Sequence, residues 1–310
     1  MMTITQTFEK FLQSLELTRA QRDNASQQHK YMREELLKRL SLETTFLTGS
    51  YARKTAVRPL NDIDVFVVFK ETDEVNPDNA PGDLLNTVKQ TLEEIYPGKT
   101  SSPQARSVNI EFTQTGISYD VVPAFIDRDD PDIYRIPDLE ASAWIATNPM
   151  THKTISTEAN EAANKKLKPL LKAVKHANNF NDRPARSFHL EVLSWGILTS
   201  DPGAYIDGLV VLLRGLADQI MDPCPDPAGL GPDIRPSQEK LLRSQKWLNE
   251  AAKLADEAQE LAAKGRTGEA HKKLRELFGA QWPEKGTSGK GGGGLIVPGT
   301  SVDDQRSRFG

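Results

Sequence analysis

The sequence predicts an α+β protein with two lobes, the first mixed and the second helical. The clearest buried strand is the β-branched and aromatic run DIDVFVVF, which ends at Phe69. An alternating hairpin follows it, and beyond Pro137 almost every apolar pattern has helical spacing. We therefore expect a sheet-containing lobe with an N-terminal helix over residues 1–145, a helical lobe over 146–283 and a flexible Gly-rich tail over 284–310.

The first half alternates helical and strand patterns. Apolar residues at helical spacing between residues 5 and 40 predict one or two long amphipathic helices. Turn residues then separate short β-branched runs from a second helical pattern. The elements that follow are a strand over 44–47, a short helix over 51–55, a strand over 63–69, a helix over 82–96 and a hairpin of strands over 108–112 and 117–121.

The second half reads as a series of helices. Pro169 should start or kink a helix, and loops rich in Pro and Asp surround residues 222–236. The run GKGGGG and its flanks, residues 286–310, have too few apolar residues to fold alone. The predicted helices cover residues 157–178, 189–198, 205–220, 237–263 and 267–278.

Composition excludes several classes of protein. The formal net charge of -4 argues against general duplex nucleic-acid binding, which depends on an excess of Lys and Arg. No apolar run approaches the roughly 20 residues that span a bilayer, and the start, MMTITQTFEKF, lacks the features of a signal peptide. The single cysteine, Cys224, has no partner for an internal disulfide. We expect a cytoplasmic protein with no membrane association.

Residues 165–186 form a strongly basic segment within this acidic chain. It contains seven basic residues and one acid, Asp182. A local positive surface suits a small polyanion such as a triphosphate, and it is also typical of an ordinary solvated helix face. The basic residues are Lys165, Lys166, Lys168, Lys172, Lys175, Arg183 and Arg186.

Three acidic residues are spaced so that their carboxylates can meet. Asp62 and Asp64 lie two apart on the predicted strand and so point to the same side, and the strand SYDVV brings Asp120 beside them. Because each carboxylate opposes ionisation of the next, the group favours a bound divalent cation. An all-oxygen set fits two Mg²⁺ ions, with Mn²⁺ as the alternative, and Asp120 is also placed to accept a proton from an attacking hydroxyl.

A Gly-Ser turn precedes this pair. Gly49 lets the backbone come close to a phosphate, and Ser50 offers a hydroxyl and an N–H at the start of a short helix. Arg53, Lys54 and Arg58 add positive charge nearby, although each is equally consistent with an ordinary surface residue. An Asp-x-Asp pair alone also occurs in solvated turns, but the whole order of strand, Gly-Ser, Asp-x-Asp, apolar strand and lone Asp predicts a nucleotidyltransferase site.

The first half resembles the DNA polymerase β-type nucleotidyltransferase superfamily. It is most similar to the CD-NTase branch, the bacterial enzymes related to cyclic GMP-AMP synthase and oligoadenylate synthase. The resemblance rests on Gly49 and Ser50, on RPLNDIDVFVVF and on the run YDVVP, and it continues through LLKAVKHANN and ARSFHLEVL. It implies a two-lobed polymerase β-like nucleotidyltransferase fold over about residues 1–280.

The resemblance also implies nucleotide contacts in the second half. Lys172 and Ser187 are the positions expected to contact the donor triphosphate, and Phe188 is expected to stack on a base. Lys175 lies one turn beyond Lys172 and is the alternative contact. Core packing is the alternative role for Phe188, and His189 is expected to be a packed or capping residue rather than a catalyst.

The product implied by the resemblance is a cyclic oligonucleotide made from nucleoside triphosphates. We expect a di- or trinucleotide that contains adenosine, a second messenger in antiphage defence of the CBASS type, with ATP as a substrate. A linear nucleotidyltransferase acting on RNA, protein or a small molecule would share the same residues, and a non-catalytic, antitoxin-like scaffold is a third reading. The tail ends at Gly310, so conjugation by a ubiquitin-transfer-like partner is a further expectation, with a tail of no role as its alternative.

Overall fold

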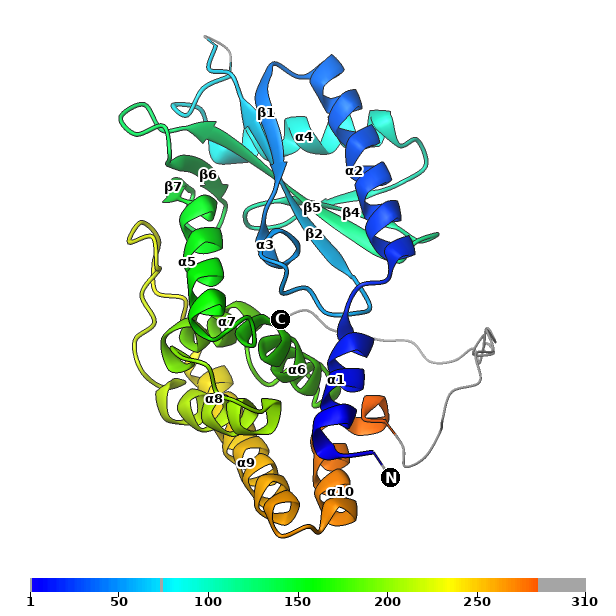
Figure 1. Cartoon of the computed structure of the whole chain (residues 1–310). Coiled ribbons are helices and arrows are strands. Elements are labelled where there is room, and N and C mark those ends of the chain that lie inside the picture. Colours follow the sequence, from blue (N-terminus) through cyan, green and yellow to red (C-terminus); the bar gives the residue numbers. More distant parts are fainter. Residues whose placement is uncertain (1, 73–74, 284–310) are drawn as a thin grey trace.

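The structure is a computed structural model that describes residues 2–72 and 75–283. Figure 1 shows two lobes, a sheet flanked by helices and a bundle of helices, with α5 running between them. The described strands are β1 (Leu42–Leu47), β2 (Asp62–Phe69), β3 (Ser101–Pro103), β4 (Val108–Phe112), β5 (Ile117–Ile126), β6 (Tyr134–Asp138) and β7 (Ala143–Thr147). The helices in the sheet lobe and the connection are α2 (Arg19–Arg39), α3 (Gly49–Ala52), α4 (Pro81–Ile95) and α5 (Pro149–Ala162).

The remaining helices form the helical bundle. They are α1 (Ile4–Leu15), α6 (Leu167–Phe180), α7 (Ser187–Ile197), α8 (Tyr205–Gln219), α9 (Gln238–Ala263) and α10 (Thr267–Phe278), followed by a short 3₁₀ turn, Gly279–Gln281. The structure thus confirms the α+β class. No helix in residues 2–72 or 75–283 is long and apolar enough to cross a membrane.

The seven described strands form one mixed sheet. Its main order is β1-β2-β5-β4-β3, and β6 and β7 extend it from the far end of β5. β2 and β5 run parallel, whereas β1 pairs with β2, and β4 with β5, in antiparallel fashion. The predicted hairpin of β4 and β5 is therefore present, and its second strand continues to Ile126.

The central strand β2 buries both of its faces, which explains its unbroken apolar run. Ile63, Val65 and Val67 point to one face and pack with α2 and α4. Phe66 and Val68 point to the other face and join a smaller cluster with β5 and β6. The two aspartates that open β2 share this second face, at the end of the strand where the apolar cover stops.

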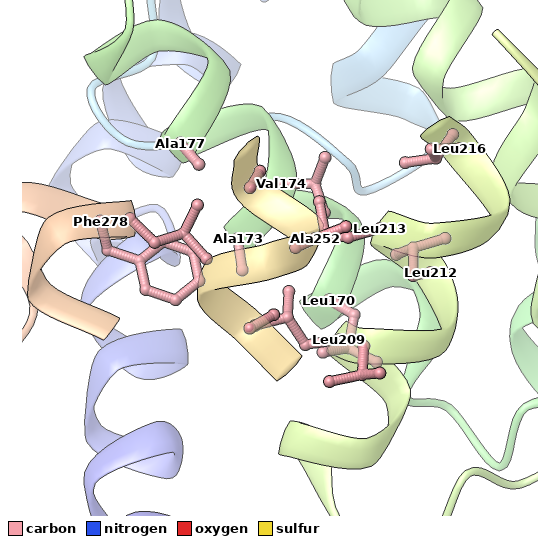
Figure 2. Packing of buried hydrophobic residues seen from close by; sticks show 14 of the residues in the cluster. Leu170, Ala173, Val174, Ala177, Leu209, Leu212, Leu213, Leu216, Ala252 and Phe278 are labelled. Atoms are coloured by element: carbon pink, nitrogen blue, oxygen red, sulfur yellow. The ribbon is translucent and has the colours of Figure 1, made fainter. Parts of the chain in front are cut away.

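The helical bundle has its own core. Figure 2 shows side chains from α6, α8, α9 and α10 meeting in one apolar cluster. Leucine and alanine dominate the contact, so the helices can approach closely. The residues labelled in the figure are Leu170, Ala173, Val174, Ala177, Leu209, Leu212, Leu213, Leu216, Ala252 and Phe278.

The first helix packs with this bundle rather than with the sheet. Phe8 and Phe11 of α1 are fully buried, and their rings contact Phe278 and Trp282 at the end of the described chain. The indole Nε1–H of Trp282 donates to His271 Nδ1 at 3.2 Å. The predicted lobe boundary after residue 145 stays a prediction, but this packing places α1 in the core of the second lobe.

Replacing Trp282 with alanine should lower the free energy of unfolding by about 3 to 5 kcal/mol, because it removes a fully buried ring and leaves a cavity. Urea unfolding followed by circular dichroism measures the change. Leu242→Ala serves as the control, since Leu242 is 53% exposed on α9 and should change the same quantity by roughly 0.5 kcal/mol or less. Equal losses in both variants would show that the aromatic cluster does not anchor α1.

Two sequence predictions for the region after residue 126 need correction. The predicted helix over 157–178 is interrupted, because Asn164 and Lys165 adopt left-handed φ values of 50° and 62° between α5 and α6. Pro169 lies in the first turn of α6, where proline is tolerated. The strands β6 and β7 were not predicted, since each has only five residues and β6 contains a proline and two charged residues. The predicted tail, 284–310, lies outside the described residues, and with it Gly310; both stay predictions.

Candidate active site

Three carboxylates line one cavity at the end of the sheet. β2 and β5 place Asp64 directly beside Asp120, and Asp62 two residues earlier faces the same way. Paired strands lie about 4.8 Å apart, so these side chains are close neighbours. All three line an open cavity of about 590 Å³ between the sheet and the helical bundle. The structure therefore brings together the acidic trio that the sequence predicts.

The carboxylates influence one another's ionisation. Burial, reinforced by the charges of Asp120 and Asp62, raises the pKa of Asp64 from its ordinary value of 3.8 to about 6, although the charge of Arg53 lowers it. Burial also raises the pKa of Asp120, against a hydrogen bond that Asn109 Nδ2 donates to its Oδ1 at 2.8 Å. A cation between these groups would relieve the repulsion.

The donor set fits a divalent cation that shares its ligands with a substrate. Among the described residues, no three His, Cys, Asp or Glu side chains form a metal cage on their own. Mg²⁺ does not need such a cage, because it is usually held by one or two carboxylates together with water and substrate phosphates. Asp64 and Asp120, as neighbours on parallel strands, supply such a pair. Asp62 lies at the cavity edge on the same face.

The Gly-Ser turn lies directly against the carboxylates. Gly49 has a φ of 62°, and a Cβ at this position would lie 1.6 Å from Asp64 Oδ2. The preceding backbone N–H, from Thr48, donates to the carbonyl of Asp64 at 2.9 Å and fixes the turn to β2. The carbonyl of Ser50 accepts the N–H of Thr55 at 2.9 Å, which closes the connection after α3. Gly49 and Ser50 both line the cavity.

The helical side of the cavity is formed by the start of α7. Ser187 is its first residue, and both Ser187 and Phe188 line the cavity. Phe188 is half-buried and packs against the bundle core; its ring lies 4.9 Å from Arg53 Cζ and 5.5 Å from the ring of His152. His189 is fully buried, and burial lowers its pKa to about 4, so it is neutral at pH 7.

The lysine that reaches the cavity is Lys175 rather than Lys172. Lys172 Nζ is bound to Glu16 Oε1 at 2.5 Å, at the end of α1, and Lys172 does not line the cavity. Lys175 lies almost one turn further along α6 and does line it, and its Nζ donates to Glu191 Oε2 at 3.0 Å and to the carbonyl of Thr55 at 3.2 Å. The structure thus favours the alternative that the sequence left open.

Carboxylates neutralise much of the basic segment. The described ion pairs that involve it are Lys165 with Glu161, Lys166 with Asp201, Lys172 with Glu16, and Lys175 with Glu191. Arg183 and Arg186 line the cavity. Burial lowers the pKa of Arg186, and the charge of Arg106 on the opposite wall lowers it further. The segment contributes positive charge to the cavity through Lys175, Arg183 and Arg186, whereas Lys165, Lys166 and Lys172 are paired with carboxylates and do not line it.

Several residues in or beside the cavity were not predicted from the sequence. Asn109 is the register partner of Asp120 in the hairpin, and its polar side chain between two apolar neighbours was the available signal. Glu191 is a lone acid within the apolar run HLEVL, which was a comparable signal. His152 Nε2 lies 2.6 Å from Asp226 Oδ1, and their separation of 74 positions in the sequence left no local pattern to find.

Comparisons with known proteins support the fold. An Acinetobacter protein named cyclic AMP-AMP-AMP synthase is 34% identical over 209 residues, covering 62% of this chain and 58% of that protein. The match thus spans less than two thirds of that relative. The structure of Escherichia coli MS115-1 CdnC with ATP has a TM-score of 0.71 and 21% identity, covering 90% of this chain and 99% of CdnC. Vibrio cholerae DncV in its GTP-bound form has a TM-score of 0.73 and 14% identity, covering 91% and 96%. These similarities confirm the two-lobed polymerase β-like fold.

A family model matches the sheet-containing part of the chain. Residues 2–160 match the Second Messenger Oligonucleotide or Dinucleotide Synthetase domain, abbreviated SMODS. The match is 159 of 310 residues, just over half of the chain. It includes the Gly-Ser turn and all three aspartates. The chain therefore belongs to the SMODS domain family of CD-NTases.

Proposed function

We propose that this chain is a metal-dependent nucleotidyltransferase that joins nucleoside triphosphates into a cyclic oligonucleotide. The observation that carries the proposal is the side-by-side placement of Asp64 and Asp120, with Asp62 and the Gly49 turn, in one cavity of about 590 Å³. Sites for small molecules occupy roughly 300–1,000 Å³. Membership of a family described as second-messenger oligonucleotide or dinucleotide synthetases supports the same reaction class.

In the proposed step, a ribose hydroxyl oxygen attacks the α-phosphorus of a nucleoside triphosphate. A phosphodiester bond forms, and the bond to pyrophosphate breaks. Asp120 accepts the hydroxyl proton, a role that suits a carboxylate whose pKa burial has raised. Asn109 keeps that carboxylate oriented through its 2.8 Å hydrogen bond.

We assign Asp62, Asp64 and Asp120 to the binding of two Mg²⁺ ions, with Mn²⁺ as the alternative. Such ions, when bound, neutralise the negative charge of carboxylates and phosphates and assist both the attacking and the leaving oxygen. The support from this chain is the raised pKa of Asp64, which burial causes and the charges of Asp120 and Asp62 reinforce. The all-oxygen donor set agrees with a hard cation.

The remaining cavity walls supply groups suited to a nucleotide. Gly49 and Ser50 form a close backbone approach for phosphate, and Ser187 lies at an N-terminal helix end, where free N–H groups favour anions. Lys175 adds a cation beside the Gly-Ser connection. Phe188 lines the cavity and is only half-buried, so part of its ring is available to a base.

The two lysines of α6 give a direct prediction. Lys175→Met should weaken binding of a nonhydrolysable ATP analogue by about tenfold or more, because it removes a charge that lines the cavity. Lys172→Met should have a clearly smaller effect, since Lys172 is paired with Glu16 away from the cavity. Isothermal titration calorimetry with the ATP analogue measures the Kd of each variant and shows which lysine contributes more to binding. A larger loss for Lys172→Met would restore the assignment that the family resemblance implied.

Adenosine is the base that the comparisons favour. Relatives from Acinetobacter and Escherichia coli are named cyclic AMP-AMP-AMP synthase, and one from Enterobacter hormaechei is named cyclic AMP-AMP-GMP synthase. We infer an adenosine-containing di- or trinucleotide for this chain, with ATP as a substrate. A second messenger in antiphage defence is the role that we propose for it.

Product analysis tests this function. The purified protein is incubated with Mg²⁺ and each nucleoside triphosphate, singly and mixed, and the products are treated with phosphatase and identified by mass spectrometry. A cyclic product has no terminal phosphate, so it should survive the phosphatase. Linear products alone would favour the linear nucleotidyltransferase, and bound nucleotide with no product would favour the non-catalytic scaffold.

A further inference from the structure

A fully buried carboxylate lies among the residues that line the cavity. Glu191 of α7 has no exposed surface. Its Oε1 accepts Arg53 Nε–H at 2.6 Å and the hydroxyl of Thr55 at 2.9 Å, and its Oε2 accepts Lys175 Nζ–H at 3.0 Å. Thr55 is also fully buried, and the two cations are each less than a tenth exposed. One carboxylate thus binds three side chains in a buried junction.

The carboxylate is charged in this junction. Burial alone would raise the pKa of Glu191, but the charges of Lys175 and Arg53 outweigh burial and lower the pKa to about 2. Two cations therefore face one anion, and the junction carries one positive charge in excess. Buried charges are costly unless they are paired and hydrogen-bonded, so the sequence retains an arrangement that apolar residues would replace at lower cost.

The junction joins the two lobes at the phosphate turn. Arg53 and Thr55 follow α3 in the connection between β1 and β2, whereas Lys175 and Glu191 lie on α6 and α7. In Figure 1, α3 lies on the side of the sheet lobe that faces these helices. Lys175 Nζ also donates to the carbonyl of Thr55 at 3.2 Å. The two helices therefore bind the backbone of the connection as well as its side chains.

Both cations also face the cavity. Arg53 and Lys175 line it, and the guanidinium of Arg53 lies over the ring of Phe188 at 4.9 Å. The charge of Arg53 reaches Asp64 as well, whose pKa it lowers. A guanidinium has five N–H donors, so the contact between Nε and Glu191 leaves others for the cavity. Because Glu191 holds Arg53, it determines where this positive charge lies between the acidic trio and Phe188.

We propose that Glu191 is a positioning residue of the nucleotide site, which holds Arg53 and Lys175 in place for the donor triphosphate and ties the Gly-Ser connection to the helical lobe. This inference rests on the proposed function and adds residues to it. Glu191 touches neither substrate nor metal; it acts through the two cations. A bound triphosphate would neutralise the one excess positive charge of this junction.

The test is Glu191→Gln, which preserves size and removes the charge. We expect the Kd for a nonhydrolysable ATP analogue to rise about tenfold or more, because the cations lose the anion that orients them. Hydrogen exchange of the backbone amides of residues 50–56 should become faster, while exchange in the β4–β5 hairpin stays unchanged. Glu158→Gln, an exposed Glu on α5, is the matched control and should change neither measurement. Unchanged affinity and exchange in folded Glu191→Gln would overturn the proposal.

A second variant decides the matter if Glu191→Gln does not fold. Thr55→Val keeps the shape of the side chain and removes one hydrogen bond to the carboxylate. We expect roughly a threefold rise in the same Kd, together with faster exchange over residues 50–56. Wild-type affinity and exchange in Thr55→Val would overturn the proposal in that case. Failure of the proposed function is seen separately, because it appears as absence of product in the wild-type protein, whereas this inference concerns the ratio between variant and wild type.

Discussion

Replacing Gly49 with alanine should abolish nucleotide transfer while the sheet lobe remains folded. The new Cβ would lie 1.6 Å from Asp64 Oδ2 and 2.5 Å from its Cγ, so the carboxylate must leave its place. A displacement of this size in a reacting group costs roughly a hundredfold or more in rate. Product formation from labelled nucleotides and Mg²⁺ measures the loss, and circular dichroism confirms the fold.

Gly116→Ala separates this collision from backbone strain. Gly116 has a φ of 67°, close to the 62° of Gly49, but no described atom lies within 4 Å of where its Cβ would be. Backbone strain should cost both variants about 1 to 2 kcal/mol of stability, because alanine is strained in the left-handed region, and the collision with Asp64 adds to this cost in Gly49→Ala alone. Only Gly49→Ala should lose activity. An active Gly49→Ala protein would show that the position of Asp64 beside the turn is not needed for the reaction.

The double variant Asp62→Asn with Asp64→Asn should also remove activity. Amides cannot replace carboxylates as charged ligands of a divalent cation, and we expect product formation to fall by roughly 10³-fold or more. The matched control is Asp129→Asn with Asp132→Asn, since both residues are exposed and lie away from the cavity. Retained activity in the first pair, measured at saturating Mg²⁺, would refute the assignment of the carboxylates.

Asp64→Asn alone should stabilise the metal-free protein at neutral pH. The pKa of Asp64 is about 6 in the folded chain and 3.8 as its ordinary value, so the folded state favours the protonated form. The free energy of unfolding of the wild type therefore falls by up to about 3 kcal/mol as pH rises from about 4 to about 6. The variant lacks this loss, so the two proteins should agree near pH 3.5 and differ above pH 6. Urea unfolding across this range, with a chelator present, measures the difference.

The fold was largely predictable because its strands and helices carry different apolar periods. DIDVFVVF is apolar throughout since β2 is covered on both faces, and α4 repeats its apolar residues at helical spacing. β6 and β7 escaped notice because each has only five residues, and β7, at the edge of the sheet, buries none of them. The break after α5 escaped for another reason: Asn164 and Lys165 adopt left-handed conformations, which Asn favours only weakly as a signal and Lys does not signal at all.

The parts of the site that lie on one strand were also predictable. Asp62 and Asp64 share a face by the period of a strand, and Asp120 follows from the next apolar strand. The helical contribution depends on how two lobes meet, which no local pattern reveals. For this reason the sequence did not show that Lys175 rather than Lys172 faces the cavity. The role of Glu191 also emerged only from the structure, because its partner Arg53 is 138 positions away in the sequence.

The most direct measurement of the central claim is a crystal structure with Mn²⁺ and a nonhydrolysable ATP analogue. Anomalous scattering locates the metal without reference to the protein density. We expect metal bound by Asp62, Asp64 and Asp120, with the triphosphate against the turn at Gly49. A triphosphate bound elsewhere, or metal that contacts none of the three carboxylates, would contradict it.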